Sequence, residues 1–378
     1  MNFSTVAGQE KVKEILRKNI LTSRLAHATL LYGKSGVGKL PLAIAAAQYI
    51  HCENRNEEDA CGKCRACIKQ EKLLHPDTHF VLPIFPKKHG SNENLTSDDF
   101  IENFRTFFKK NPYLSIQQWL STLSQENKQL FITINDIRHL QKKAAFKPFE
   151  SHAKVIIIWH IEKITNEAAN SFLKFLEEPP PQTFIFLTAE DTTLLLPTIL
   201  SRCQKIYVPG LYTQEIINYL AQNHEITPAK AAEIAALAQG SLSTAIEIQE
   251  VTTQPFSPIF MDWMRICYKG LLVEIDNWAK KMSSESKENQ KLFLQFSIQK
   301  LREAFTFSIL SDNSSPSSFL YLSQEEKKFF ENFSKFLNLE KINKMFTTLE
   351  QHLYYLSRNA NAYMLFYTLS LKLNTILK

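Results

Sequence analysis

Glycine is scarce in this sequence, and long apolar runs are absent. Only 9 of the 378 residues are glycine, well below the average of roughly 7%, so the positions of these few residues are informative. No run of eighteen apolar residues occurs, and a membrane-spanning helix is therefore not expected. The N-terminal residues contain no basic segment followed by an apolar stretch, the pattern of a secretory signal. We accordingly expect a cytoplasmic protein.

A large excess of one charge is absent as well. The net charge is +6, which permits a polyanionic partner but is too small to identify one. Hydrophobic residues make up 44% of the chain and charged residues 22%. These values are typical of a folded protein and exclude a disordered or fibrous chain. A length of 378 residues predicts two or three domains.

Short apolar runs alternate with helical patterns over the first two hundred residues. The runs are β-branched or aromatic and are bounded by polar or turn residues, as buried strands are. The predicted strands are 29–32, 80–82, 131–134, 155–158 and 184–187. Predicted helices between them include Pro41–Ile50, Ile137–Ala145 and Glu167–Leu176. Strands that alternate with helices predict an α/β domain with a mostly parallel sheet covered on both faces.

The rest of the chain is predicted to be helical. Residues 86–129 interrupt the alternation of strands and helices and are interpreted as an insertion. Two short helices, Thr213–Gln222 and Pro228–Gln239, follow the last strand signal, and apolar residues at helical spacing continue from about residue 255. The predicted domains are 1–208, an α/β nucleotide-binding-type domain, 209–250, a small helical lid, and 251–378, an all-α domain.

Three of the nine glycines belong to one heptapeptide between a predicted strand and a predicted helix. The residues are Gly33, Lys34, Ser35, Gly36, Val37, Gly38 and Lys39. In a phosphate-binding loop, glycines allow consecutive backbone N–H groups to surround a phosphate, and the lysine reaches the terminal phosphates. The heptapeptide is therefore a predicted nucleotide-binding loop (P-loop).

Two groups that an active nucleotide hydrolase needs are missing. The residue after Lys39 is Leu40, which cannot ligate Mg²⁺ as serine or threonine does. The strand 155–158 ends in Trp159 and His160 rather than in carboxylates, and Glu162 is in the wrong register for that role. We therefore expect no ATP hydrolysis by this chain alone. The P-loop is interpreted as vestigial, with ATP or ADP binding left open.

Four of the six cysteines lie within sixteen residues of one another. They are Cys52, Cys61, Cys64 and Cys67, with two residues between neighbours at the last two steps. This spacing is typical of turns that wrap a tetrahedral metal ion, and disulfides are disfavoured in the cytoplasm. The cysteines predict a structural Zn²⁺ site with no open coordination position. An iron–sulfur cluster is the competing interpretation.

Several motifs together resemble one protein family. They are the P-loop, the four-cysteine module, Leu176-Glu177-Glu178-Pro179-Pro180 and Ser201-Arg202-Cys203, with His75-Pro76-Asp77 after the cysteines. The sequence is similar to the bacterial DNA polymerase III clamp-loader subunits of the AAA+ type, and among them to the delta-prime family, which is related to gamma/tau. The resemblance covers roughly residues 1–85 and 130–245 and is thinner beyond them.

The resemblance implies a role for Arg202. In this family the arginine of the Ser-Arg-Cys motif projects into the ATP site of a neighbouring subunit, so Arg202 is the expected arginine finger, acting in trans. Active ATPase subunits of the family carry threonine, an Asp-Glu pair and a lid arginine where this chain has Leu40, Trp159-His160 and Ser243. These departures favour a stationary, non-hydrolysing delta-prime subunit over a gamma/tau motor.

The resemblance also implies a hetero-oligomeric ring with other clamp-loader subunits (gamma/tau and delta), in which residues 251–378 join a helical collar. Its expected function is to help load the sliding clamp on primed DNA as part of DNA polymerase III. Two alternatives are a catalytically competent gamma/tau-type ATPase and a zinc-dependent interaction protein without a role in replication. Arg138, Lys142, Lys143 and Lys147 form a basic set that either faces duplex DNA or is a solvated helix face.

Overall fold

The described part of the chain forms two compact units. The computed structural model describes residues 1–85, 95–123, 129–224, 226–251, 256–309, 328–329, 331–333, 338–358 and 360–378. The first unit contains Met1–Tyr212 and Gly240–Ser243, and the second contains Thr213–Gln239 and Thr244–Lys378. The further division of the helical part near residue 250 stays a prediction.

The first unit is built on a sheet of five parallel strands. The strands are β1 (Ala28–Tyr32), β2 (Thr78–Val81), β3 (Lys154–Ile158), β4 (Thr183–Ala189) and β5 (Gln204–Tyr207), in the spatial order β2-β3-β4-β1-β5. Every pair of neighbours is parallel. The predicted α/β fold with a parallel sheet is therefore confirmed.

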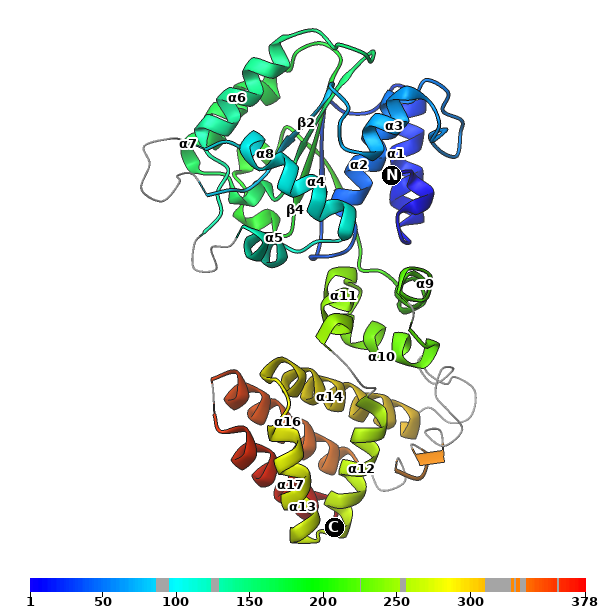
Figure 1. Cartoon of the computed structure of the whole chain (residues 1–378), viewed down its shortest axis with the longest axis vertical. Coiled ribbons are helices and arrows are strands. Elements are labelled where there is room, and N and C mark those ends of the chain that lie inside the picture. Colours follow the sequence, from blue (N-terminus) through cyan, green and yellow to red (C-terminus); the bar gives the residue numbers. More distant parts are fainter. Residues whose placement is uncertain are drawn as a thin grey trace. The chain divides into compact units, whose positions relative to one another are not determined.

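Helices cover both faces of this sheet because its side chains alternate between them. Val155 and Ile157 of β3 pack in one core with α1 (Glu10–Leu21) and α2 (Lys39–His51), whereas Ile156 and Ile158 pack in the other. The second core is completed by α6 (Ile134–Ala145), α7 (Asn166–Glu177) and α8 (Pro197–Leu200). Figure 1 shows α1 and α2 on one side of the strands and α6 and α7 on the other.

The sequence-based prediction of strands was wrong at two places. Residues 131–134 make only isolated bridges, from Phe131 to Ile84 and from Ile132 to Ile164. The run ends early because the Thr133 side chain accepts a hydrogen bond from the backbone of Asp136 and caps α6, which begins at Ile134. The edge strand β5 was missed because only Ile206 among its four residues is buried.

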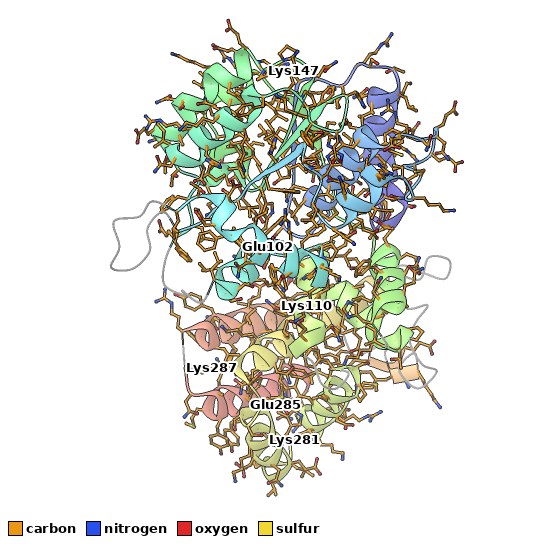
Figure 2. The ribbon with its side chains drawn as sticks, turned by 45° about the horizontal axis from the view of Figure 1, so that its top comes forward. Glu102, Lys110, Lys147, Lys281, Glu285 and Lys287 are labelled. Atoms are coloured by element: carbon orange, nitrogen blue, oxygen red, sulfur yellow. The ribbon has the colours of Figure 1, made fainter. Side chains whose placement is uncertain are left out.

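The predicted insertion packs on the first core. Its described part contains a short 3₁₀ turn (Ser97–Phe100), α4 (Ile101–Lys110) and α5 (Ile116–Thr122), and residues 86–94 and 124–128 lie outside the described residues. Figure 2 labels Glu102 and Lys110 near the two ends of α4. Phe104 and Trp119 are fully buried, with ring centroids 5.9 Å apart, and the Trp119 indole N–H donates to the Pro83 carbonyl at 2.9 Å. The insertion is therefore part of the core.

Asp77 organises the loop that enters β3 at the amino end of the sheet. This carboxylate is only 3% exposed and accepts hydrogen bonds of 2.5–2.8 Å from the backbone N–H groups of Phe149, Glu150 and Ser151. The Lys154 ammonium donates to the carbonyls of Ala144 and Phe146. The buried carboxylate of Asp77 and the buried ammonium of Lys154 thus fix the segment 146–151, since both form hydrogen bonds to backbone groups of this region.

The second unit is a helical bundle. Its helices are α9 (Thr213–Asn223), α10 (Pro228–Ala238), α11 (Leu242–Val251), α12 (Phe256–Lys269), α13 (Leu272–Ser283), α14 (Lys287–Ile309), α16 (Leu339–Ser357) and α17 (Ala362–Leu377). The first two residues of α11 belong to the first unit. The rings of Trp263 and Trp278 stack at 4.7 Å, and Trp263 donates to the Ser370 hydroxyl. Glu233 of α10 accepts hydrogen bonds from the first two backbone N–H groups of α12. Of the helices searched among the described residues, none combines the length and apolarity that crossing a membrane requires.

We expect Asp77→Ala to lower the free energy of unfolding by about 3 kcal/mol, because three N–H groups lose a charged acceptor in a region with little access to water. The control is Asp191→Ala, which removes an exposed carboxylate that caps only a short 3₁₀ turn and should lower the free energy of unfolding much less. Urea unfolding of the full chain measures both. Equal effects of the two substitutions would contradict the anchoring role of Asp77.

Candidate functional site

The P-loop connects β1 to α2, as the sequence predicts, but its lysine points back onto the loop itself. The Lys39 ammonium donates to the carbonyl of Gly33 at 2.7 Å and to that of Lys34. The side chain is only 7% exposed, and burial lowers the pKa of Lys39 to about 8, although the charges of Glu190 and Glu162 act in the opposite direction. The cation is thus engaged by carbonyls of its own loop, and two carboxylates offset part of the cost of its burial.

The segment Gly240–Ser243, which follows α10 in the sequence and belongs to the first unit, contacts the same loop. The Leu242 N–H donates to the Gly36 carbonyl at 2.9 Å. A Cβ atom at Gly36 would lie 2.4 Å from the Ser241 hydroxyl and 2.5 Å from that of Ser243, and Gly36 has a φ of +68°. Glycine is therefore required here by close packing as well as by backbone conformation. On another side, a Cβ at Gly38 would lie 3.3 Å from the ring of Tyr113 in the insertion.

The end of β3 offers no aspartate to a metal ion. His160 follows the strand with a left-handed φ of 54°, and its Nδ1 donates to Glu162 Oε1 at 2.8 Å. Burial raises the pKa of Glu162, but the hydrogen bond and the charge of His160, together with hydrogen bonds from backbone N–H groups, outweigh burial, so the pKa of Glu162 is lowered. Thr188 of β4 accepts a hydrogen bond from the His160 backbone N–H and donates one to the Ile158 carbonyl, so it links the ends of β3 and β4. Leu40 is buried in the first core.

Glu190 is a residue of this site that the sequence did not reveal, and it meets Glu162, which from the sequence was considered only as a metal ligand. The Glu190 N–H donates to Glu162 Oε1 at 3.2 Å, and Glu190 Oε1 lies 3.8 Å from His160 Nε2. Both carboxylates act on Lys39 electrostatically. The signal that identifies them is positional: they follow β3 and β4, which are neighbouring parallel strands, so they meet at the carboxyl edge of the sheet. There they offset part of the charge of Lys39.

The four cysteines come together as predicted. The sulfurs of Cys52, Cys61, Cys64 and Cys67 all lie within 4.8 Å of one another, and those of Cys61 and Cys67 are 4.0 Å apart. A tetrahedral zinc ion with bonds of about 2.3 Å holds its sulfurs about 3.8 Å apart. An iron–sulfur cluster places several irons and sulfides between its cysteines, and this set leaves room for a single ion. The residues present therefore fit zinc.

Backbone groups favour thiolates at this cysteine site. The N–H groups of Lys63 and Cys64 donate to the sulfur of Cys61, and that of Cys61 donates to Cys52. The Lys63 hydrogen bond is the main cause of a Cys61 pKa lowered to about 6. Zinc binds thiolates, so these N–H groups stabilise the form that the metal needs. When bound, the ion would cross-link the chain segment before α3 (Arg65–Glu71) to the end of α2.

Arg202 lies at the opposite edge of the sheet from the P-loop. It follows α8 and precedes β5, whose first residue, Gln204, pairs with Thr29 of β1. Four residues of extended chain, roughly 13 Å, separate Thr29 from Gly33. The guanidinium donates to the Thr198 carbonyl at 2.8 Å and forms an ion pair with Glu177. Arg202 therefore does not belong to the nucleotide site of its own chain.

Comparison with known proteins places the chain in one family. The family model described as "DNA polymerase III, delta subunit" matches residues 8–211. The chain belongs to this family. The DNA polymerase III subunit delta-prime of Bacillus subtilis is 31% identical over 64% of this chain and 59% of its own length. The delta-prime subunit of Haemophilus influenzae is 28% identical over 52% of this chain and 51% of its own length. The resemblance to delta-prime clamp-loader subunits is thus confirmed.

The chain is also similar to proteins of a different name. A DNA polymerase III subunit gamma/tau of Mycoplasma genitalium is 28% identical over 66% of this chain and 35% of its own length. The chain spans less than two thirds of the length of each of these curated relatives. A solved DNA polymerase III gamma subunit-related protein of Thermotoga maritima covers 97% of this chain and 99% of its own, at 14% identity and a TM-score of 0.34, a likeness too low to support an argument.

The burial of Lys39 leads to a prediction about the stability of this chain. The ammonium of Lys39 destabilises the folded state, because its folded pKa of about 8 lies below the unfolded value of 10.5. The penalty is complete below the folded pKa and disappears as the pH rises to the unfolded value. Lys39→Met is therefore expected to raise the free energy of unfolding at neutral pH by as much as about 3 kcal/mol.

The matched control for this substitution is Lys34→Met, which removes an exposed lysine of the same loop and should leave stability unchanged. Urea unfolding of both variants and of the natural chain, at neutral pH and above pH 10.5, measures the effect. A gain from Lys39→Met that is the same at both pH values would show that the buried charge is not its cause.

The cysteine site predicts that the purified chain contains about one zinc ion, measured by elemental analysis. Cys64→Ser should abolish this zinc and lower the melting temperature, because the metal cross-link is lost. Cys203→Ser changes an isolated buried cysteine and should leave the zinc content unchanged. Iron, or no metal at all, in the freshly purified chain would overturn the assignment.

Proposed function

We propose that this chain is a clamp-loader subunit of DNA polymerase III, which helps to load the sliding clamp on primed DNA. The family match over residues 8–211 and the delta-prime names of the relatives support this proposal. Its partners are other clamp-loader subunits of the gamma/tau and delta kinds in a hetero-oligomeric ring, with residues 251–378 as the collar. The sliding clamp and primer-template DNA are reached through the complex.

Within this complex the chain acts as a stationary subunit that does not hydrolyse ATP. Leu40 supplies no hydroxyl to Mg²⁺, and His160 stands where an active site carries a carboxylate. Lys39 is engaged by carbonyls of its own loop, and Ser241 and Ser243 pack against Gly36. A nucleotide would have to displace these contacts without a metal ligand to compensate. The geometry favours a closed P-loop over a gamma/tau-type ATPase.

The position of Arg202 carries the second part of the proposal, that it serves the ATP site of a neighbouring subunit. Arg202 is held at the amino edge of the sheet, whereas the P-loop is at the carboxyl edge. Hydrogen bonding to Thr198 and pairing with Glu177 fix the guanidinium, and one third of its side chain remains exposed. A planar cation with five donors, held ready at a surface, can stabilise the charge that develops on a transferred phosphoryl group.

Arg202→Ala in the reconstituted complex tests this role. We expect the ATP turnover at the site that Arg202 completes to fall by about 10³-fold. The total ATP turnover of the complex then falls by the fraction that this one site contributes. Clamp loading should fall as well. Assembly, followed by size-exclusion chromatography, should persist because the collar formed by residues 251–378 is unchanged. Lys205→Ala, which removes an exposed cation of the adjacent strand, is the control and should change neither activity.

Unchanged ATP turnover in the Arg202→Ala complex would contradict the role of Arg202 as an arginine finger. The isolated chain gives an independent result on hydrolysis. Turnover by the isolated chain that disappears in Lys39→Ala would contradict the stationary role and favour the gamma/tau-type ATPase.

A further inference from the structure

Two phenylalanines are exposed at the amino edge of the sheet. Phe146 is 74% exposed and Phe149 is 82% exposed, and they flank Lys147 and Pro148 directly after α6. Exposed large apolar side chains that gather at one place usually mark a binding surface. Neither the P-loop, the cysteines nor Arg202 uses these rings.

Unpaired cations accompany the two rings. The structure divides the basic set predicted around α6: Lys143 pairs with Asp98, whereas Arg138, Lys142 and Lys147 are exposed. Within the described ranges, none of these three cations forms a hydrogen bond or an ion pair. Lys142 and Phe146 are four residues apart, one helical turn, so they lie on the same side at the end of α6. Lys147 is labelled at the top edge of the first unit in Figure 2.

A groove adjoins the rings. Its volume is about 890 Å³, and its apolar lining includes Leu74, Phe80 and Ile101 together with Phe146 and Phe149. Its two carboxylates, those of Asp77 and Asp98, are already engaged. Asp77 accepts three backbone N–H groups, and Asp98 accepts from Lys143 and His139. The charge left for a ligand at this groove is therefore positive.

The loop that carries the rings is preorganised. Asp77 holds the backbone of Phe149, and Lys154 holds the carbonyl of Phe146. Both anchoring groups are buried. A ligand that contacts the two rings thus does not have to order the loop first, which lowers the entropic cost of binding.

We propose that Phe146, Phe149, Lys142 and Lys147 form a binding surface for single-stranded DNA. Unpaired bases stack on the exposed rings, and the lysines contact the phosphates on either side. Duplex DNA does not fit this surface equally well, since its bases are stacked on one another and unavailable to the rings. An acidic protein segment would use the lysines but not base stacking. The surface is distinct from Arg202, and its binding does not depend on ATP hydrolysis.

Fluorescence anisotropy of a labelled single-stranded oligonucleotide with the isolated full chain tests this proposal. We expect Phe146→Ala/Phe149→Ala to weaken binding about 10- to 100-fold, through loss of base stacking, with the dependence on salt nearly unchanged. Lys147→Ala should lower the slope of log Kd against log salt by about 0.7. An unlabelled duplex of the same length should compete poorly.

The controls are Tyr212→Ala, an aromatic residue that is 77% exposed elsewhere in the first unit, and Lys11→Ala on α1; both should bind as the natural chain does. Equal competition by duplex, or a double phenylalanine variant that binds normally, would overturn the proposal. The surface would instead be a protein interface if the natural chain does not bind the oligonucleotide and the double variant loses its pairing with another clamp-loader subunit. Clamp loading by the complex is a separate readout, so failure of this proposal leaves the proposed function intact.

Discussion

The parallel direction of all five strands is the constraint on which the rest of the first unit depends. It places every strand's carboxyl end at one edge of the sheet and every amino end at the other. The P-loop, His160 and Glu162 are therefore gathered at the carboxyl edge, and Arg202 and the Asp77-anchored loop at the amino edge. One chain thus carries two chemically different surfaces, separated by the length of its strands. In the proposed assembly, the working groups are those of the amino edge.

At the carboxyl edge, groups of the protein itself contact the P-loop through both charge and volume. A buried lysine without phosphate is costly, and the chain offsets it with carbonyls of the loop and with the fields of Glu162 and Glu190. Volume is excluded where Ser241 and Ser243 meet Gly36, and where Tyr113 approaches Gly38. The same glycines that would admit a phosphate here admit parts of the protein itself. A glycine motif therefore indicates close approach, and the identity of the approaching group depends on the rest of the fold.

Prediction from the sequence succeeded where local patterns determine structure. The strands at 28–32, 154–158 and 183–189 and the four-cysteine cluster follow from apolar runs and from spacing. It failed where two local signals competed, because the Thr133 cap starts α6 inside an apolar run. It also failed for β5, because only one of the four residues of this strand is buried. The grouping of Glu162 with Glu190 and Lys39 was beyond reach, because it depends on which strands are neighbours. The exposure of Phe146 could not be predicted either, because an apolar residue at a helix end is usually buried.

The path of the chain around Gly240–Ser243 has a consequence for how the molecule can be divided. These four residues belong to the first unit, although residues of the second unit precede and follow them. The polypeptide therefore crosses between the units three times, and Thr213–Gln239 is a closed excursion with both ends fixed to the first unit. A chain ended at Tyr212 would retain the whole sheet but lose the strap over Gly36. Tyr212 is therefore not a simple domain boundary. The contact of residues 240–243 with the P-loop requires that the intervening segment Thr213–Gln239 be present.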